Sequence, residues 1–253
     1  MNFVSVSSRV RSIGLILAAI AAGGPAAYAA CTVASLTGTY AITSVGLSTS
    51  GQPVSSLDQI VADGKGHITG SSTRSNNGVI TTSTLTGKYT VAATCIATVT
   101  FTNEDKTIEH DKLILNNGNL GAFLIETDNK HTQSSVAVAQ GTATCTNLGV
   151  KNIYSAEATG TVLGTGQIAV VGQVTFNGKG ALTGSATYSA DGAITSATLR
   201  GTYQINANCT GTAALTLPGL AKMNVALVVV NGGKEIVLIQ TDADSIVTGS
   251  FRL

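Results

Sequence analysis

Tryptophan is absent from this chain of 253 residues, and aromatic and charged residues make up only 4% and 11% of it. Once Arg9 and Arg11 of the N-terminal segment are left out, 12 basic side chains face 13 acidic ones, a net charge of −1. Proteins that bind nucleic acid present a basic face, so this balance excludes nucleic acid from the expected partners. The chain also lacks a polybasic segment or basic amphipathic helix, which excludes attachment to a membrane surface by that route.

Apolar runs long enough to span a bilayer are missing as well. The clearest apolar run, residues 13–22, is far shorter than the ~20 residues that a membrane helix needs. Two arginines precede it and an Ala-x-Ala sequence at 27–29 follows, an order typical of a secretory signal peptide. We therefore predict a signal peptide over residues 1–30 and a secreted, periplasmic or outer-surface protein that is not integral to the membrane.

Glycine, threonine, serine, valine and alanine dominate the rest of the chain, a composition typical of short strands joined by tight turns. No segment after residue 30 keeps the 3.6-residue apolar period of a helix. Asp-Gly and Asn-Gly pairs fit two-residue hairpin turns, which need positive φ. In the first half of the chain we expect strands over residues 39–45, 58–63, 67–75, 79–92, 96–101, 111–115, 121–128 and 134–139.

The chain contains an internal duplication. Residues 64–95 align without a gap to residues 178–209, an offset of 114 positions, and 17 of the 32 aligned residues are identical. "DGKGHITGS" in the first copy corresponds to "NGKGALTGS" in the second, and its glycines predict a hairpin corner and a strand kink. A phosphate-binding loop would need a helix after it, whereas a Thr-rich strand follows here. The duplication predicts two domains, residues 31–140 and 145–253.

About eight short strands per copy, joined hairpin to hairpin, form an antiparallel meander with two exposed edges unless the sheet closes. We therefore predict an all-β fold of two tandem antiparallel eight-stranded meander barrels. One larger, fused barrel is the alternative arrangement.

Four cysteines in an exported chain suggest two disulfides, and four cysteines allow three connectivities. The duplication favours Cys31–Cys95 and Cys145–Cys209, because each copy then carries one equivalent bridge. A lipid anchor on Cys31 is the alternative, although it would leave Cys95 without a partner. Metal binding by these cysteines is disfavoured because none lies in a Cys-x-x-Cys pair.

The search for chemistry finds no catalytic motif and no expected cofactor. The three histidines, His67, His110 and His131, accompany no recognisable nucleophile. The charged segment 103–112 offers oxygen and imidazole ligands for a divalent cation but fits no EF-hand, and a solvated hairpin tip is the favoured interpretation. The second copy has the apolar segment 217–226 there, for which we expect packing against the other domain, the rim of a pocket or contact with a partner.

Glu126 is the sharpest single candidate. Strand alternation puts it on the face of Ala122 and Leu124, while Phe123 and Ile125 face the other way, so this strand and its counterpart are expected to be covered on both sides. A carboxylate facing a barrel interior has a raised pKa and could act as an acid or bind a polar group, whereas one at the strand end reaches water. With Glu126, the weak ligand-binding candidates are its counterpart Gln240 and four tyrosines at matched positions, which packing also explains: Tyr40, Tyr89, Tyr154 and Tyr203.

The order "GTY…DGKG…TGS…NG…LTGKYTV…C", repeated as "IYS…NGKG…TGS…DG…LRGTYQI…C", resembles secreted bacterial barrels of the allene-oxide-cyclase-like fold. The resemblance implies an eight-stranded antiparallel barrel with an internal cavity, and it transfers no catalytic residue. Our leading hypothesis is a non-catalytic exported protein that binds a small apolar ligand. The alternatives are a surface or structural interaction module, with self-association, and a cyclase- or isomerase-like enzyme with a shaped cavity.

Overall fold

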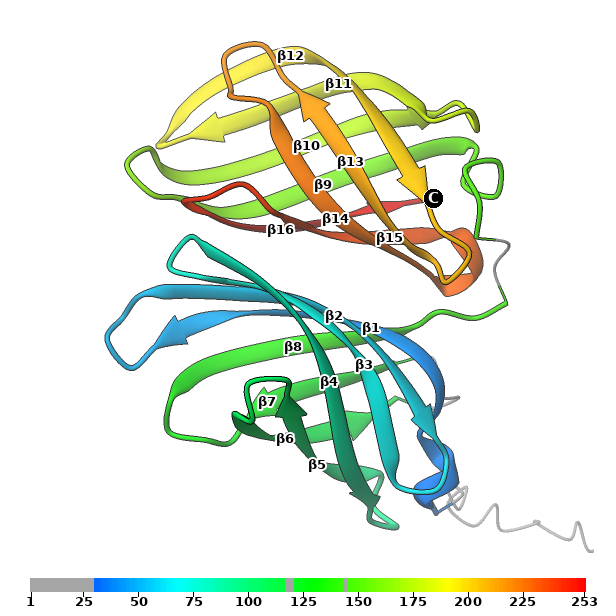
Figure 1. The fold of residues 1–253 in the computed structure, drawn as a ribbon. Helices are drawn as coiled ribbons and strands as arrows, with labels where there is room; N and C mark the ends of the chain where they lie inside the picture. The colour runs from blue at the N-terminus through cyan, green and yellow to red at the C-terminus, as the bar shows by residue number, and fades with distance from the viewer. Residues whose placement is uncertain (1–29, 117–120, 143–144) are drawn as a thin grey trace, which may run out of the picture.

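Two closed β-barrels follow one another along the chain in a computed structural model, which describes residues 30–116, 121–142 and 145–253 (Figure 1). Each barrel has eight antiparallel strands in meander order, so the predicted fold class is confirmed and the single fused barrel is not what forms. The predicted signal peptide lies outside the described residues except for its last position, residue 30. The Asn117-Gly118 turn lies entirely outside them. Within the described ranges we find no helix with the length and apolarity needed to cross a membrane.

The first barrel closes where β8 pairs with β1. Its strands are β1 (Thr37–Ser48), β2 (Pro53–Asp63), β3 (His67–Asn76), β4 (Val79–Val91), β5 (Ile96–Asn103), β6 (Ile108–Leu115), β7 (Gly121–Glu126) and β8 (His131–Ala139). The eight expected strands are all present. The largest difference is at β2, which begins at Pro53 instead of 58, because a proline is tolerated as the first residue of a strand.

The second barrel repeats this order with the same register, and β16 closes on β9. Its strands are β9 (Asn152–Val162), β10 (Gly166–Phe176), β11 (Ala181–Ala190), β12 (Ala193–Ile205), β13 (Thr210–Thr216), β14 (Met223–Val230), β15 (Glu235–Gln240) and β16 (Ser245–Arg252). The Tyr40–Ile60 pair of β1 and β2, for example, corresponds to the Tyr154–Val174 pair of β9 and β10. Positions 114 apart are therefore structurally equivalent, and the barrels can be compared residue by residue.

The repeated "DGKG" and "NGKG" segments are hairpin corners held by a side chain. Asp63 Oδ1 accepts hydrogen bonds from the backbone N–H groups of Lys65 and His67, at 2.7 and 2.9 Å. Asn177 Oδ1 makes the two corresponding bonds, at 2.7 and 3.0 Å. Gly64 has a φ of +73°, which glycine adopts without strain. Both copies thus need a short acceptor side chain followed by glycine.

The glycine inside the third strand of each barrel serves close contact between strands. A Cβ atom at Gly70 would collide with the carbonyl oxygen of Gln59, and one at Gly184 with the carbonyl oxygen of Gln173. Larger residues are therefore excluded at both positions, as a strongly coiled sheet requires.

Each barrel carries its own disulfide. Cys31 bonds to Cys95 and Cys145 to Cys209, with Cα–Cα distances of 4.9 and 4.8 Å. The connectivity favoured by the duplication is confirmed. Each bridge ties the segment before the first strand to the turn between the fourth and fifth strands.

The outer faces of β1 and β2 pack against the outer faces of β14, β15 and β16, which joins the two barrels (Figure 1). The apolar centre of this contact is formed by Ala41, Leu57, Val228, Val237 and Ile239. Strand β15 is consequently buried on both faces, as the sequence predicts.

The same prediction is wrong for β7. Its outward residues Phe123 and Ile125 are exposed, because no second sheet lies over this side of the first barrel among the described residues.

Candidate functional site

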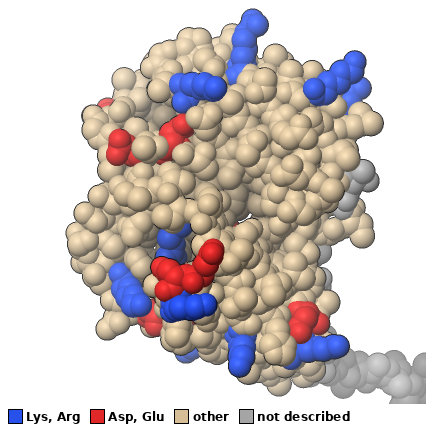
Figure 2. All heavy atoms as spheres, viewed as in Figure 1, with Lys and Arg blue, Asp and Glu red and all other residues tan. Residues whose placement is uncertain are grey.

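One end of the first barrel holds a cluster of charged side chains that point inward from five strands. Alternation places Asp58 of β2, Arg74 of β3, Glu109 and Asp111 of β6, Glu126 of β7 and His131 of β8 around this end of the interior. We call these six residues the polar cluster. Figure 2 shows acidic and basic side chains gathered on this face of the first barrel, on a molecule whose surface is otherwise mostly uncharged.

Two ion pairs organise the polar cluster. Arg74 Nη2 donates to Glu109 Oε2 at 2.8 Å, and His131 Nδ1 lies 3.0 Å from Glu126 Oε1. The Glu126 residue is only 7% exposed, so its carboxylate faces the interior as the alternation of β7 predicts. These pairs leave two of the four carboxyl groups, Asp58 and Asp111, without a charged partner of their own.

Two carboxylate oxygens of the polar cluster are buried without a hydrogen-bond partner among the described residues: Asp58 Oδ1 and Glu126 Oε2. The carboxyl group of Asp58 also accepts a long bond from Ser56 Oγ, at 3.3 Å to Oδ2, and is hydrogen-bonded by Ser72. Buried polar atoms are normally paired with protein, water or ligand. The cluster therefore has unused capacity to accept hydrogen bonds.

Burial raises the pKa values of two carboxyl groups of the polar cluster. Burial, followed by the nearby charges of Glu109 and Glu126, raises the pKa of Asp111 to about 8. Burial also raises the pKa of Asp58 to about 6, although hydrogen bonding to Ser72 and the charge of Arg74 oppose it. Asp111 and Glu126 are paired across β6 and β7, so two carboxyl groups lie at neighbouring positions of the barrel interior.

A cavity of about 20 Å³ lies among these side chains. Charged groups from Asp58, Arg74, Glu109 and Asp111 line it. Two serines also line it, the buried Ser44 of β1 and the half-buried Ser135 of β8, which are hydrogen-bonded to each other at 2.7 Å. Its volume suits one water molecule or one group of similar size. The site can therefore receive an ammonium-sized head group but no larger organic molecule without rearrangement.

The second barrel carries no charged side chain at the equivalent positions. The counterparts of Asp58, Arg74, Glu109, Asp111, Glu126 and His131 are, in this order and by the common register, Gly172, Tyr188, Met223, Val225, Gln240 and Ser245. The Tyr188 hydroxyl donates to the carbonyl oxygen of Pro218 at 3.1 Å.

The apolar loop of the second copy closes this end. Leu217 is fully buried and Leu220 packs against the core of its own barrel, a location that differs from the expected packing against the other domain. Contact of this segment with a ligand or partner stays a prediction. The duplication has therefore produced one barrel end with charged side chains and one closed end without them.

The matched tyrosines lie at the opposite, packed ends of the barrels. Tyr40, Tyr89, Tyr154 and Tyr203 are buried, and each hydroxyl donates to a backbone carbonyl oxygen. In the second barrel, Phe176 makes edge-to-face contacts with three neighbouring rings, Tyr154, Tyr203 and Phe251, at centroid distances of 5.3, 4.7 and 5.2 Å. Gln240, the counterpart of Glu126, donates to Asp242 at 3.0 Å. Contact of these residues with a ligand stays a prediction.

The charged segment of residues 103–112 divides between two environments. Glu109 and Asp111 point inward, whereas His110 lies outside and pairs with Asp128 at 2.9 Å. His67 pairs with Asp63 on the surface. Over the described ranges, no three His, Cys, Asp or Glu side chains are grouped so that they could hold a metal ion.

Asp58 and Arg74 are members of the polar cluster that sequence reasoning missed. Asp58 lies in β2 and Arg74 in the Ser- and Thr-rich β3, and neither has a recognisable motif around it. The available signal was the comparison of the copies, since each is a charged residue at an inward position whose counterpart, Gly172 or Tyr188, carries no charge at neutral pH.

Comparison with known proteins adds no family assignment. No model of a protein family matches the chain, and no curated protein matches it. The chain's function must therefore be argued from its own residues.

Proposed function

We propose that this chain is a non-catalytic binding protein whose first barrel receives a small cationic head group, such as a primary ammonium, in the polar cluster. The observation that carries the proposal is the pair of buried, unpartnered carboxylate oxygens of the polar cluster, Asp58 Oδ1 and Glu126 Oε2, together with a water-sized cavity that Asp58 and Asp111 line. An ammonium group has three N–H donors and no acceptor, so it matches a site made of unused acceptors.

The charge of the polar cluster also favours a cation. Four carboxyl groups, those of Asp58, Glu109, Asp111 and Glu126, surround the guanidinium of Arg74 and the imidazole of His131. Buried charges are tolerated only when they are paired, and an unbalanced carboxyl group takes up a proton or a cation instead. In the free protein the proton resides on Asp111, whose pKa is raised to about 8.

Binding of a cation should therefore displace this proton. A positive charge near Asp111 lowers its pKa, so an ammonium ion that enters near neutral pH replaces the proton as the balancing charge. Affinity then rises with pH until Asp111 is ionised in the free protein. Arg74 and His131 act as positioning residues, because they hold Glu109 and Glu126 in place.

Calorimetric titration with methylammonium chloride tests this proposal. We expect binding to the parent protein with release of up to about one proton per chain, measured in buffers of different ionisation enthalpy. The variant Glu126→Gln introduces the residue of the second barrel at this position and should bind at least about tenfold more weakly. Glu104→Gln, at an exposed turn, is the matched control and should bind as the parent does. Equal binding by Glu126→Gln, or no binding by the parent, contradicts the proposal.

The small apolar ligand expected from the sequence stays a prediction. The packed rings of the second barrel and the aliphatic core of the first would have to move to admit it. An alkylammonium ion whose head group enters the polar cluster and whose apolar tail stays outside it would combine cation binding with the expected apolar ligand.

A cyclase- or isomerase-like activity, suggested by the resemblance to allene-oxide-cyclase-like barrels, draws on one further observation. Burial raises the pKa of Asp111 to about 8, so this carboxyl group holds a proton near neutral pH beside the ion pair of Glu126 and His131. The cavity of about 20 Å³ supports a head group better than a whole substrate. Two disulfides indicate an extracytoplasmic location, and we propose export by the N-terminal signal peptide.

A further inference from the structure

The contact between the two barrels uses different faces of a duplicated unit. The first barrel contributes the outer face of β1 and β2, and the second contributes the outer face of β14 to β16. By the offset of 114, β9 and β10 of the second barrel are equivalent to β1 and β2. In the same way, β6 to β8 of the first barrel are equivalent to β14 to β16. Both of these equivalent faces are free in the described chain.

The free face of the first barrel is an apolar patch on β6, β7 and β8. Ile114, Phe123, Ile125 and Val136 are 50, 59, 55 and 45% exposed. Ile114 pairs with Phe123, and Phe123 with Val136, so they form one row across three strands. We call these four residues the β7 patch.

The β7 patch corresponds to residues that are buried in the second barrel. Val228, Val237 and Ile239, which stand where Ile114, Phe123 and Ile125 stand, form the centre of the contact with the first barrel. The first barrel thus has large apolar side chains at Ile114, Phe123 and Ile125, although they are about half exposed among the described residues. Exposed apolar rows of this kind mark interaction surfaces.

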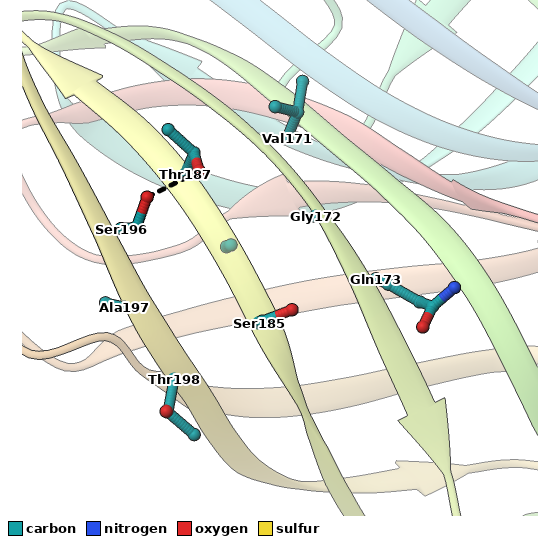
Figure 3. Close-up of a pocket in the computed structure, with 9 residues that line it drawn as sticks. Val171, Gly172, Gln173, Ser185, Thr187, Ser196, Ala197 and Thr198 are labelled. Carbon is teal, nitrogen blue, oxygen red and sulfur yellow. Dashed lines mark hydrogen bonds between the residues drawn. The ribbon is translucent and has the colours of Figure 1, made fainter.

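The free face of the second barrel is a shallow hollow over β10, β11 and β12 (Figure 3). Val171, which is 60% exposed, stands at one side of it and corresponds to the interfacial Leu57. Gln173, Ser185, Thr187, Ser196 and Thr198 line the rest of the hollow, as Figure 3 shows.

This hollow has a direct counterpart at the existing contact. Its outward residues match, position by position, the first-barrel wall of the groove between the barrels: Leu57, Gln59, Ser71, Thr73, Thr82 and Thr84. Gln59 donates from Nε2 to the carbonyl oxygen of Asn208 across the contact at 2.6 Å. Gln173 repeats Gln59, so the same donor is available on the free face.

Charged residues on the two free faces are complementary. Lys112, beside the β7 patch, takes the position of the interfacial Ala226, and Glu157, paired with Val171, takes the position of Thr43 on the other face. Across the existing contact, the Asp244 N–H donates to the Gly78 carbonyl oxygen at 3.0 Å. The equivalent positions are Lys130 and Gly192, and Asp191 adjoins the latter. In a repeated contact, the basic Lys130 of the first barrel would therefore come near Gly192 and its acidic neighbour Asp191 in the second.

We call the free outer face of β9 and β10, which carries Val171, the β9–β10 face. We infer that a second molecule of this protein docks its β7 patch on the β9–β10 face of a first molecule and so repeats the contact between the barrels. Such a contact is heterologous, since two different faces meet. It therefore continues into an open array, or closes into a ring if the rotation between copies permits. The inference is independent of cation binding, because the polar cluster points into the barrel and the docking faces point out.

Sedimentation velocity of the full-length protein over a range of concentrations tests this inference. The parent protein should form dimers and longer oligomers. Phe123→Glu on the β7 patch and Val171→Glu on the β9–β10 face should each weaken self-association at least about tenfold. Ile108→Glu is the matched control: Ile108 is an exposed apolar residue of β6 whose counterpart Lys222 is itself exposed, and its loss should have no effect.

Mixing the two single variants separates a head-to-tail contact from a patch-to-patch dimer. The Phe123→Glu chain keeps an intact β9–β10 face and the Val171→Glu chain keeps an intact β7 patch, so the mixture should form a complex of one chain of each and grow no further. In a patch-to-patch dimer, Val171→Glu would associate as the parent does and the mixture would form no mixed complex, which would overturn the inference. A parent protein that stays monomeric at every concentration would also overturn it. Ile125→Glu replaces Phe123→Glu if circular dichroism shows the latter to be unfolded.

Discussion

Arg74 Nη2 and Glu109 Oε2 lie 2.8 Å apart inside the first barrel, whereas Tyr188 and Met223 occupy the equivalent positions in the second. The same backbone register therefore supports an ion pair in one copy and two uncharged side chains in the other. This contrast makes the second barrel an internal control for the charges of the first.

Replacement of Arg74 by Tyr should destabilise the first barrel, because it removes the guanidinium and leaves Glu109, Asp58 and Asp111 together. We expect a loss of about 2–4 kcal/mol in the free energy of unfolding above pH 8, measured by urea denaturation. The loss should be smaller near pH 5, where Asp58 and Asp111, with pKa values of about 6 and about 8, are protonated. The double variant Arg74→Tyr, Glu109→Met reproduces the pair of the second barrel and should recover most of the loss. A double variant as unstable as the single one would count against this account.

Asp111 should make the protein less stable as the pH rises from 6 to 8. Its pKa is raised from 3.8 to about 8 on folding, so the folded state holds the proton more tightly and its stabilisation is complete below about pH 4. That stabilisation is lost as the pH rises to about 8, by roughly 1 kcal/mol per pH unit. Asp58, with a pKa of about 6, contributes mainly below this range.

Asp111→Asn checks this prediction. The variant should show a flatter dependence of unfolding free energy on pH between 6 and 8, and greater stability than the parent at pH 8. Glu104→Gln, on the surface, should keep the slope of the parent. An unchanged slope in Asp111→Asn would show that another group is responsible.

Removal of either disulfide should destabilise its own barrel by a similar amount. Both bridges close loops with the same sequence separation of 64, which corresponds to about 4 kcal/mol of restricted unfolded-chain entropy. The measurement is thermal unfolding of Cys31→Ser, Cys95→Ser and of Cys145→Ser, Cys209→Ser, each as a pair. A loss of stability in only one of the two paired variants would contradict the expectation that both bridges restrict the unfolded chain equally.

Gly184→Ala should destabilise the second barrel by about 1–3 kcal/mol, since the added methyl group meets the carbonyl oxygen of Gln173. Gly70→Ala should do the same in the first barrel, against the carbonyl oxygen of Gln59. Ser185→Ala, at the exposed neighbouring position, serves as the control and should change stability little. Wild-type stability in both alanine variants would contradict the close strand contact described here.

The local sequence predicts most of the fold because its signals are local or repeated. Asp63 and Asn177 mark the same hairpin corner, and the offset of 114 pairs the cysteines without reference to a structure. Alternation also places Glu126 on the inward face of β7. Each of these inferences needs only neighbouring residues or a comparison of the two copies.

The polar cluster depends on contacts that are not local. Asp58 and Arg74 reach Glu109 only because the barrel closes with a particular register. The sequences of their own strands contain no motif that indicates a charged cluster. The exposure of Phe123 was also hidden in the sequence, because β7 and β15 are equally apolar and only the position of the other barrel distinguishes them. A residue pattern shows which face is apolar but does not show which surface covers it.

The most direct test of the proposed cation site follows the Asp111 side-chain carboxyl carbon by NMR through a pH titration, with and without methylammonium chloride. Our account predicts a midpoint near pH 8 in the free protein and a clearly lower midpoint when methylammonium is present. A midpoint near the ordinary value of 3.8, or one near pH 8 that methylammonium does not move, would contradict it.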